Sequence, residues 1–210
     1  MKTLYIVRHG QTDFNLRGIV QGSGVDAPLN ATGLEQARRF FERYGGEPFD
    51  VVLTSALQRT HQTVRGFIDH GTPWEQHPTI NEMSWGSHEG KLGTPESIAE
   101  YQSIKDGWAE GRIDGRIGGG ESAREMGQRL QQFIDHLRTR PERRLLIASH
   151  GRAMCGLVTL LMGRPITRMN ELRHSNLGLW IGHEQPDGHY DFVTQNDRSH
   201  LPEELHLGKW

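Results

Sequence analysis

The stretches Ile6-Val7-Arg8-His9-Gly10 and Ile147-Ala148-Ser149-His150-Gly151 share one form, in which an apolar run is followed by two polar residues and a glycine. A short apolar run of this kind predicts a buried strand that ends in a loop. If the two strands are neighbours, His9 and His150 emerge at one sheet edge and face a single site, where each glycine lets a ligand approach the backbone. The alternative is two unrelated histidines that only satisfy hydrogen bonds in their loops.

Strands and helices alternate along the rest of the chain. Because parallel neighbours need crossover connections, this alternation predicts an α/β fold: a single-domain three-layer sandwich with a mostly parallel central sheet flanked by helices. We expect the domain to span residues 1–196 and residues 197–210 to form a peripheral polar tail. The expected strands are 3–7, 51–54 and 145–148, with a hairpin of 177–182 and 190–194.

Helix boundaries follow from caps and apolar periodicity. Thr32 and Glu35 have capping-box spacing, and Leu34 begins an apolar face that continues to Tyr44 before the glycines at 45–46. Further helices are expected from a Ser55 cap to the break at 70–71, from a Thr94 cap to about 106, over about 123–137 and over about 152–162.

The composition is that of a globular chain with nearly balanced charge. It has 210 residues, 24 Lys plus Arg, 26 Asp plus Glu and one cysteine, Cys155. A net charge of −2 argues against a general binder of nucleic acid or membrane surfaces. Cys155 lies in an apolar run and is interpreted as a buried, inert thiol. The N-terminal apolar run is too short for a signal peptide and no later run has membrane-spanning length, so we expect a cytoplasmic protein.

The charges near the two histidines indicate the ligand. Arg8 precedes His9, and Arg59 lies in the first turn of the helix after the second strand, where free backbone amides also favour an anion. Guanidinium groups match phosphate oxygens and stay charged, so this pair suits a phosphate. A rival interpretation is a metal held by His9, His150 and Glu82, but two fixed cations would repel a metal ion. We therefore expect neither a metal nor another cofactor.

Three further polar residues are candidates for the same rim. Glu82 follows a predicted short strand, precedes a Gly-rich loop and is predicted either as a proton donor or as a surface carboxylate. Asn15 and Gln21, in the long loop after His9, are predicted to hydrogen-bond phosphate or substrate, or else to be simple turn residues. The glycines at 118–120 are interpreted as a flexible helix entry, and no role is assigned to eight other histidines: His70, His77, His88, His174, His183, His189, His200 and His206.

Together these motifs resemble the histidine phosphatase superfamily, also called phosphoglycerate mutase-like, over about residues 3–183. The family signature begins Arg-His-Gly and continues to an Asn, as in the segment from Arg8 to Asn15 here. Order and spacing also agree at Gln21-Gly22, Asp26 to Leu29, Thr32-Gly33 to Ala37, Thr54-Ser55 to Arg59-Thr60, Gln62-Thr63, Glu82, Gly86, Glu89-Gly90, Gly119 to Ser122 and Ser149-His150-Gly151.

The resemblance implies a role for each matching residue. It implies that His9 is a nucleophile that forms a phosphohistidine and that Arg8, Arg59 and His150 hold the phosphoryl group. Glu82 is then the general acid and afterwards the base. The residues predicted to bind phosphate or substrate are Arg8, Asn15, Gln21, Gly22, Arg59, His150 and Gly151.

Some positions depart from the family pattern. The family often has Pro where Ala56 stands, which affects loop rigidity. Arg152 replaces a frequently small residue and is predicted either to bind a second anion, such as a substrate carboxylate, or to face water. Trp85 and His88 lie in loop positions near Glu82 that could shape specificity.

Three functions fit this sequence. The first is a phosphomonoesterase acting on a small phosphorylated metabolite. The second is a phosphoglycerate mutase, although family mutases carry a longer insertion where this chain has the connection from Gly90 to Gly118. The third is a catalytically silent phospholigand-binding protein, which the presence of every matching catalytic residue disfavours. The sequence predicts neither the individual substrate nor an oligomeric state.

Overall fold

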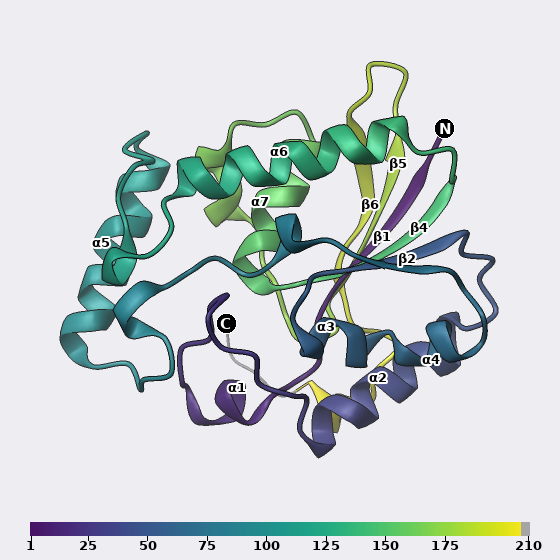
Figure 1. The fold of residues 1–210 in the computed structure, drawn as a ribbon, viewed down its shortest axis with the longest axis horizontal. Helices are drawn as coiled ribbons and strands as arrows, with labels where there is room; N and C mark the ends of the chain where they lie inside the picture. Colours follow the sequence, from purple (N-terminus) through teal and green to yellow (C-terminus); the bar gives the residue numbers. More distant parts are fainter. Residues whose placement is uncertain (207–210) are drawn as a thin grey trace.

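The computed structural model describes residues 1–206 and centres on a six-stranded sheet with the order β3-β2-β4-β1-β5-β6 (Figure 1). The strands β3, β2, β4 and β1 are parallel, whereas β5 and β6 form an antiparallel hairpin beside β1. The predicted mostly parallel sheet is therefore confirmed. The strand bounds are β1 Thr3–Arg8, β2 Val51–Thr54, β3 Trp74–Gln76, β4 Arg144–Ser149, β5 Leu179–Glu184 and β6 Tyr190–Asp197.

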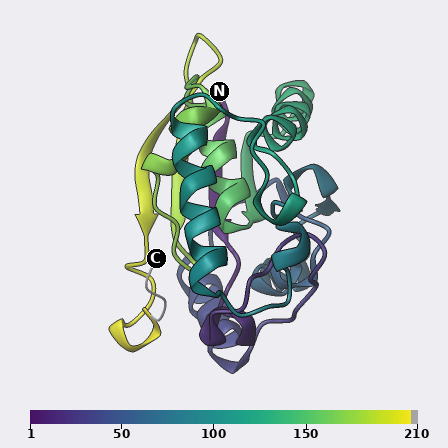
Figure 2. The same cartoon turned by 90° about the vertical axis from the view of Figure 1, so that its left-hand side faces the viewer.

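Helices cover both faces of the sheet, because strand side chains alternate between two cores. On β1, Leu4 and Ile6 pack into a core with α6 and α7, whereas Tyr5 and Val7 pack into a core with α2 and α4. In Figure 2 helix α5 lies in front, beside the first core. The helix bounds are α1 Asp13–Arg17, α2 Ala31–Tyr44, α3 Gln58–Thr63, α4 Arg65–Asp69, α5 Pro95–Ala109, α6 Ala123–Thr139 and α7 Gly151–Leu161.

Helix α2 starts two residues earlier than its capping-box spacing predicted. Its N-cap is Asn30, whose side chain accepts from the Gly33 N–H at 2.9 Å, so the prediction of Thr32 was wrong. Leu34 is 53% exposed and does not belong to the apolar face. Gly33 packs so closely on the loop after β1 that a Cβ there would lie 2.1 Å from the Gln11 carbonyl oxygen. The absence of a side chain at Gly33 therefore allows the first turn of α2 to pack directly on this backbone.

The single helix predicted after Ser55 is instead two short helices, α3 and α4, that meet at Val64. Leu57 is the N-cap and makes no side-chain capping bond. The Ser55 hydroxyl accepts from the Leu57 N–H at 3.1 Å and contacts His150 at 2.8 Å. Ser55 therefore belongs to the sheet edge and not to the helix cap.

The residues after β6 fold back against α2. Leu201 is buried in the second core, and the His200 ring packs on Phe40 and Tyr44 at 5.2 and 5.7 Å between centroids. The Gln36 amide donates to the Leu205 carbonyl at 2.8 Å. This part of the chain contributes to the core. Residues 207–210, also assigned to the predicted tail, lie outside the described residues.

Two smaller expectations concern the thiol and the helices. Cys155 is buried in α7 as predicted, and burial raises the pKa of its thiol to about 11. Among the helices of residues 1–206, none combines the length and apolar character needed to cross a bilayer.

The buried His200 imidazole makes stability depend on pH. Burial is the main cause that lowers the pKa of His200 to about 4, with Asp197 opposing and His206 and Arg43 adding smaller effects. The unfolded state therefore binds more protons below pH ~6.5, and stability is lost as pH falls toward 4. This residue contributes a loss of about 2 kcal/mol between pH 7 and pH 5.

We expect His200→Phe to remove that part of the pH dependence while keeping the aromatic packing. Urea unfolding at pH 7 and pH 5 measures it, with His183→Phe at an exposed histidine as the matched control. An identical pH dependence in wild type and His200→Phe would contradict this assignment.

Candidate active site

The two strand-end histidines meet at one edge of the sheet. Strands β1 and β4 pair in parallel with Arg8 opposite Ser149, so His9 and His150 follow at the same level. Their ring centroids are 5.2 Å apart. The predicted adjacency is confirmed, and it results from strand register.

The His9 side chain is fixed with one ring nitrogen available. Its Nδ1 lies 2.7 Å from the Gly10 carbonyl oxygen, which can only accept, so Nδ1 carries the hydrogen and Nε2 keeps its lone pair. Burial, followed by the charges of Arg59 and Arg8, holds the pKa of His9 well below its usual value. The buried imidazole is therefore neutral at physiological pH.

The His9 main chain is held from two sides. Its carbonyl accepts from the Asn176 amide at 2.8 Å, and its N–H donates to the Ser149 carbonyl at 3.0 Å. The neighbouring Leu177 has a φ of 53°, in the left-handed region that is costly for a leucine. The strained backbone at Leu177 thus lies next to Asn176, the residue that hydrogen-bonds to the His9 carbonyl.

Two buried guanidinium groups flank the histidines without a carboxylate partner. Arg8 donates to the His174 carbonyl at 3.3 Å, and its Nε has no partner among the described residues. Arg59 donates to the carbonyls of Val25 and Gly22 and, through Nε, to His150 at 3.1 Å. Because a guanidinium carries five N–H groups, both arginines keep donors for an anion. Burial is the main cause that lowers the pKa of each to about 10, so both remain charged.

His150 is neutral and has both ring nitrogens engaged. Nδ1 accepts from Arg59, which leaves the hydrogen on Nε2 to donate to the Ser55 hydroxyl at 2.8 Å. Burial, with Arg59 as the next cause, holds the pKa of His150 well below its usual value. The geometry therefore ties His150 to Arg59 and fixes both groups beside His9.

Glu82 is a buried carboxylate held by main-chain N–H groups. Oε1 accepts from Met83 and Ala153 at 2.9 and 3.0 Å, and Oε2 accepts from Arg152 at 3.1 Å. Two of these donors belong to the first turn of α7, where free N–H groups favour a negative charge. Glu82 is 8% exposed, which excludes a solvated surface carboxylate. It follows a 3₁₀ turn, Pro78–Ile80, and not the short strand that the sequence suggested.

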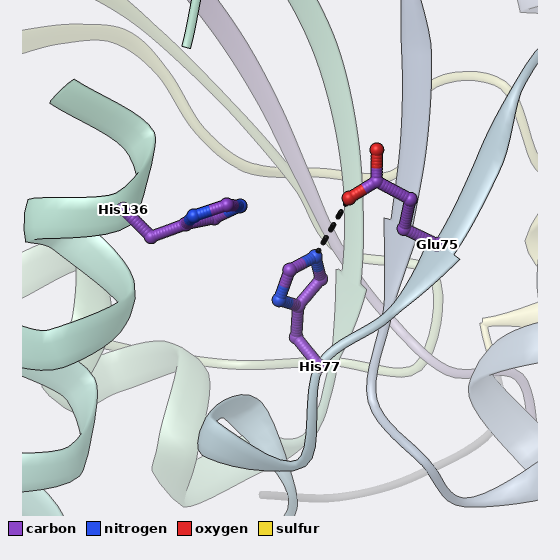
Figure 3. A group of neighbouring side chains, drawn as sticks. All are labelled: Glu75, His77 and His136. Carbon is purple, nitrogen blue, oxygen red and sulfur yellow. Dashed lines mark hydrogen bonds and ion pairs between the residues drawn. The ribbon is translucent and has the colours of Figure 1, made fainter. Parts of the chain in front are cut away.

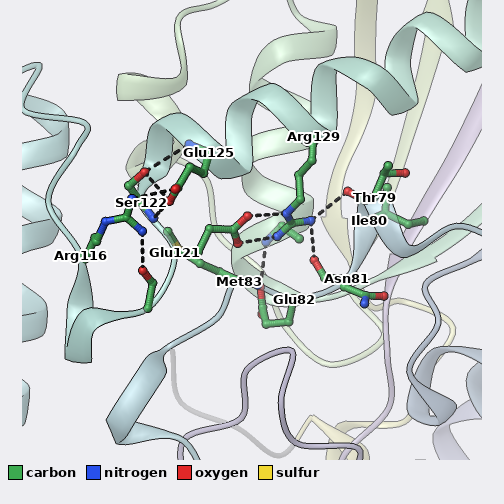
Figure 4. Close-up of polar contacts among 12 residues, drawn as sticks. Thr79, Ile80, Asn81, Glu82, Met83, Arg116, Glu121, Ser122, Glu125 and Arg129 are labelled. Atoms are coloured by element: carbon green, nitrogen blue, oxygen red, sulfur yellow. Dashed lines mark hydrogen bonds and ion pairs between the residues drawn. The ribbon is translucent and has the colours of Figure 1, made fainter.

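A second network holds the loop that carries Glu82 (Figure 4). Arg129 of α6 binds the Glu121 carboxylate through two hydrogen bonds of 2.6 and 2.8 Å. The same guanidinium donates to the carbonyls of Thr79 and Asn81 at 2.8 and 2.9 Å. Arg129 therefore fixes the backbone immediately before Glu82.

The other predicted binding residues have mixed environments. Asn15 uses its Oδ1 to cap α1 through Thr12, leaving its amide Nδ2 as the donor available for a ligand. Both side-chain polar atoms of Gln21 are buried without a partner among the described residues. Buried polar atoms are normally hydrogen-bonded, so these two are available to bind a ligand. The Gly22 carbonyl holds Arg59. The His174 ring packs against Gly151, because a Cβ at this position would lie 2.7 Å from the ring. The Gly151 backbone is therefore not open to a ligand on this side.

The sequence did not predict several residues that the fold brings to this edge. His174 and Asn176 come from the connection between α7 and β5, and no motif distinguishes them.

Arg152 is buried and contacts Tyr101 and Asn170, so the water-facing alternative is wrong. Trp85 packs on Tyr101 at 5.8 Å between centroids, and His88 pairs with Glu100 at 3.0 Å.

The ligand atoms of His9, His150 and Glu82, the rival metal site, do not gather around one point in the described residues. Within residues 1–206, the ligand atoms of three candidate metal-binding residues gather only at Glu75, His77 and His136 (Figure 3), away from His9. Arg140 already binds Glu75 through two hydrogen bonds of 2.7 Å and donates to His136 at 3.0 Å. A cation at this cluster would have to displace a guanidinium, so these residues form a structural ion pair.

Comparison with known proteins identifies the class. The model of the histidine phosphatase superfamily, branch 1, matches residues 4–198, and the chain belongs to this family. A protein from Serratia proteamaculans named "Probable phosphoglycerate mutase GpmB" is 34% identical over 188 residues, which cover 88% of this chain and 86% of the relative.

Solved structures share the fold. The alpha-ribazole phosphatase from Shigella flexneri is 26% identical, with a TM-score of 0.80 and coverage of 93% of this chain and 96% of that chain. Phosphoserine phosphatase from Entamoeba histolytica, in complex with 3-phosphoglyceric acid, is 23% identical with a TM-score of 0.80, covering 96% and 100%. The chain is therefore a member of a family of phosphoryl-handling enzymes.

We expect Arg129→Met to loosen the Glu82 loop. Losing charged hydrogen bonds to two carbonyls should raise amide hydrogen exchange in residues 79–84 about tenfold or more. Hydrogen–deuterium exchange mass spectrometry measures this, with Arg116→Met as the control because Arg116 pairs with Glu125 at 2.7 Å on the exposed side of the same region (Figure 4). Unchanged exchange in Arg129→Met would show that Arg129 does not fix the loop.

Proposed function

We propose that this protein is a metal-independent phosphatase that hydrolyses small phosphomonoesters through a phosphohistidine on His9. The observation that carries the proposal is the neutral His9 imidazole, whose Nε2 is available beside two buried guanidinium groups that lack carboxylate partners. A phosphate monoester is dianionic near neutral pH and repels nucleophiles. Transfer therefore needs charge neutralisation and an attacking atom held in line, and these residues supply both.

In the first step, His9 Nε2 attacks phosphorus and the bond to the ester oxygen breaks. Arg8 and Arg59 donate to the equatorial oxygens, and the resulting phosphohistidine is stabilised by the same donors. Glu82, carrying a proton, transfers it to the leaving alkoxide. His150 orients Arg59 through their 3.1 Å hydrogen bond and lies next to the transferring group.

In the second step, water attacks phosphorus and the bond to Nε2 breaks. Glu82, now ionised, takes a proton from the water, and His9 leaves as a neutral imidazole whose Nδ1 hydrogen is still held by Gly10. The products are inorganic phosphate and the alcohol. The main-chain donors to Glu82 stabilise its ionised state between the two steps.

A mutase is the second candidate because the Serratia relative bears a mutase name at similar length. The alignment covers 88% of this chain and 86% of that relative, so the two chains have similar lengths and chain length does not separate this protein from it. The two reactions share the first step and differ in whether water or a second substrate hydroxyl receives the phosphoryl group.

We expect phosphate release from small phosphomonoesters in EDTA, and a loss of about 10³-fold or more in kcat for His9→Ala because the nucleophile is removed. His183→Ala, at an exposed histidine, is the control and should keep wild-type turnover. Activity that EDTA abolishes would refute the metal-independent mechanism. Phosphoryl transfer between phosphoglycerates without phosphate release would favour the mutase.

A further inference from the structure

Arg152 places a third buried guanidinium next to the proposed phosphoryl site. It lies in the first turn of α7, immediately after His150 and Gly151, and is 8% exposed. Its side chain donates to the Asn170 amide oxygen at 2.9 Å and the Tyr101 hydroxyl at 2.5 Å, and its Nε has no partner among the described residues. All of its side-chain hydrogen-bond partners within residues 1–206 are therefore neutral.

A buried cation with only neutral partners is costly, and an anion would compensate it. Glu82 is near, but its two oxygens already accept main-chain N–H groups, including that of Arg152 itself at 3.1 Å. The Glu82 charge favours the ionised guanidinium, but no carboxylate of the described residues hydrogen-bonds to it, so the unpartnered Nε–H is available to a ligand anion.

His174 lies on the other side of the same turn. Its ring covers Gly151, and its main-chain carbonyl accepts from Arg8, so it joins the surroundings of Arg8 to those of Arg152. Its Nδ1 is buried without a partner among the described residues. Burial, then Arg8 and Arg152, holds the pKa of His174 well below its usual value, so the ring is neutral and can donate one hydrogen bond.

The elements opposite Arg152 are held rigidly. Tyr101 of α5 packs on Trp85, and its hydroxyl accepts from Arg152, which leaves the hydroxyl hydrogen free to donate. Asn170, in the 3₁₀ turn Ile166–Glu171, donates to the Lys105 carbonyl at 2.8 Å. The unpartnered donors are thus fixed in position, as a preorganised binding site requires.

We infer that Arg152, Tyr101 and His174 form a carboxylate-binding subsite, so that the protein prefers phosphomonoesters bearing a carboxylate near the ester. This inference rests on the proposed function. It also balances the charge: three guanidinium groups face a dianionic phosphoryl group and one carboxylate, while Glu82 carries the proton that it donates. A phosphomonoester without a carboxylate leaves the Arg152 Nε–H without a hydrogen-bond partner among the described residues.

The test compares 3-phosphoglycerate with glycerol 3-phosphate, which has an alcohol in place of the carboxylate. We expect wild type to favour 3-phosphoglycerate by about tenfold or more in kcat/KM, the worth of a charge-assisted hydrogen bond. Arg152→Met should lower that ratio by about tenfold or more, mainly through KM, and Arg152→Lys should restore part of it. Tyr101→Phe should lower it less.

Arg164→Met, which removes an exposed arginine beyond the end of α7, is the matched control and should leave the ratio unchanged. A wild-type ratio near one, or an equal loss on both substrates in Arg152→Met, would overturn the inference. The wild-type ratio and Tyr101→Phe decide the question if Arg152→Met does not fold.

A binding measurement separates this inference from the proposed function. In the His9→Ala background, calorimetry should show 3-phosphoglycerate binding about tenfold or more tighter than glycerol 3-phosphate, and Arg152→Met should remove the difference. Equal affinities would refute the subsite even if catalysis occurs. Absent turnover of both substrates and of p-nitrophenyl phosphate would refute the proposed function while the binding difference remained.

Discussion

The candidate active site depends on buried positive charge at the carboxyl edge of the parallel strands. Arg8 and Arg59 lie beside two neutral imidazoles, and Glu82 is a buried carboxylate whose charge acts on both arginines. Such a cluster is costly without an anion and favourable with one. Burial, followed by the same charges, lowers the pKa of His9 and keeps it unprotonated, so the environment that binds a phosphoryl group also keeps its attacking nitrogen available.

The fold holds this cluster together by register and by main-chain hydrogen bonds. Pairing of β1 with β4 fixes the separation of His9 and His150, and a slip of one residue would send the side chains at the strand ends to the opposite face. Carbonyls of the loop after β1 hold Arg59, the first turn of α7 holds Glu82, and Arg129 holds the segment before it. The reacting groups therefore come from separate elements that are each fixed by backbone.

The sequence predicted those parts of the site that local patterns encode. Apolar runs ending at His9 and His150 predicted two strand ends, and their shared form predicted that they meet. Long-range packing was not predictable: Asn30 caps α2 where Gly33 packs on the Gln11 backbone, and the predicted helix after Ser55 divides at Val64. His174 and Asn176 reach the site only through the connection into β5, which no spacing reveals. The roles of His9, Glu82 and the arginines in catalysis stay predictions.

The most direct test is to detect the phosphoryl group on the enzyme. The protein would be mixed with a phosphomonoester and quenched within milliseconds in alkali, where a phosphohistidine survives. Peptide mass spectrometry would then locate the phosphate. The account predicts phosphate on the peptide containing His9, attached to that histidine and absent from His9→Ala. Turnover with no phosphopeptide, or phosphate on another residue, would contradict the central claim.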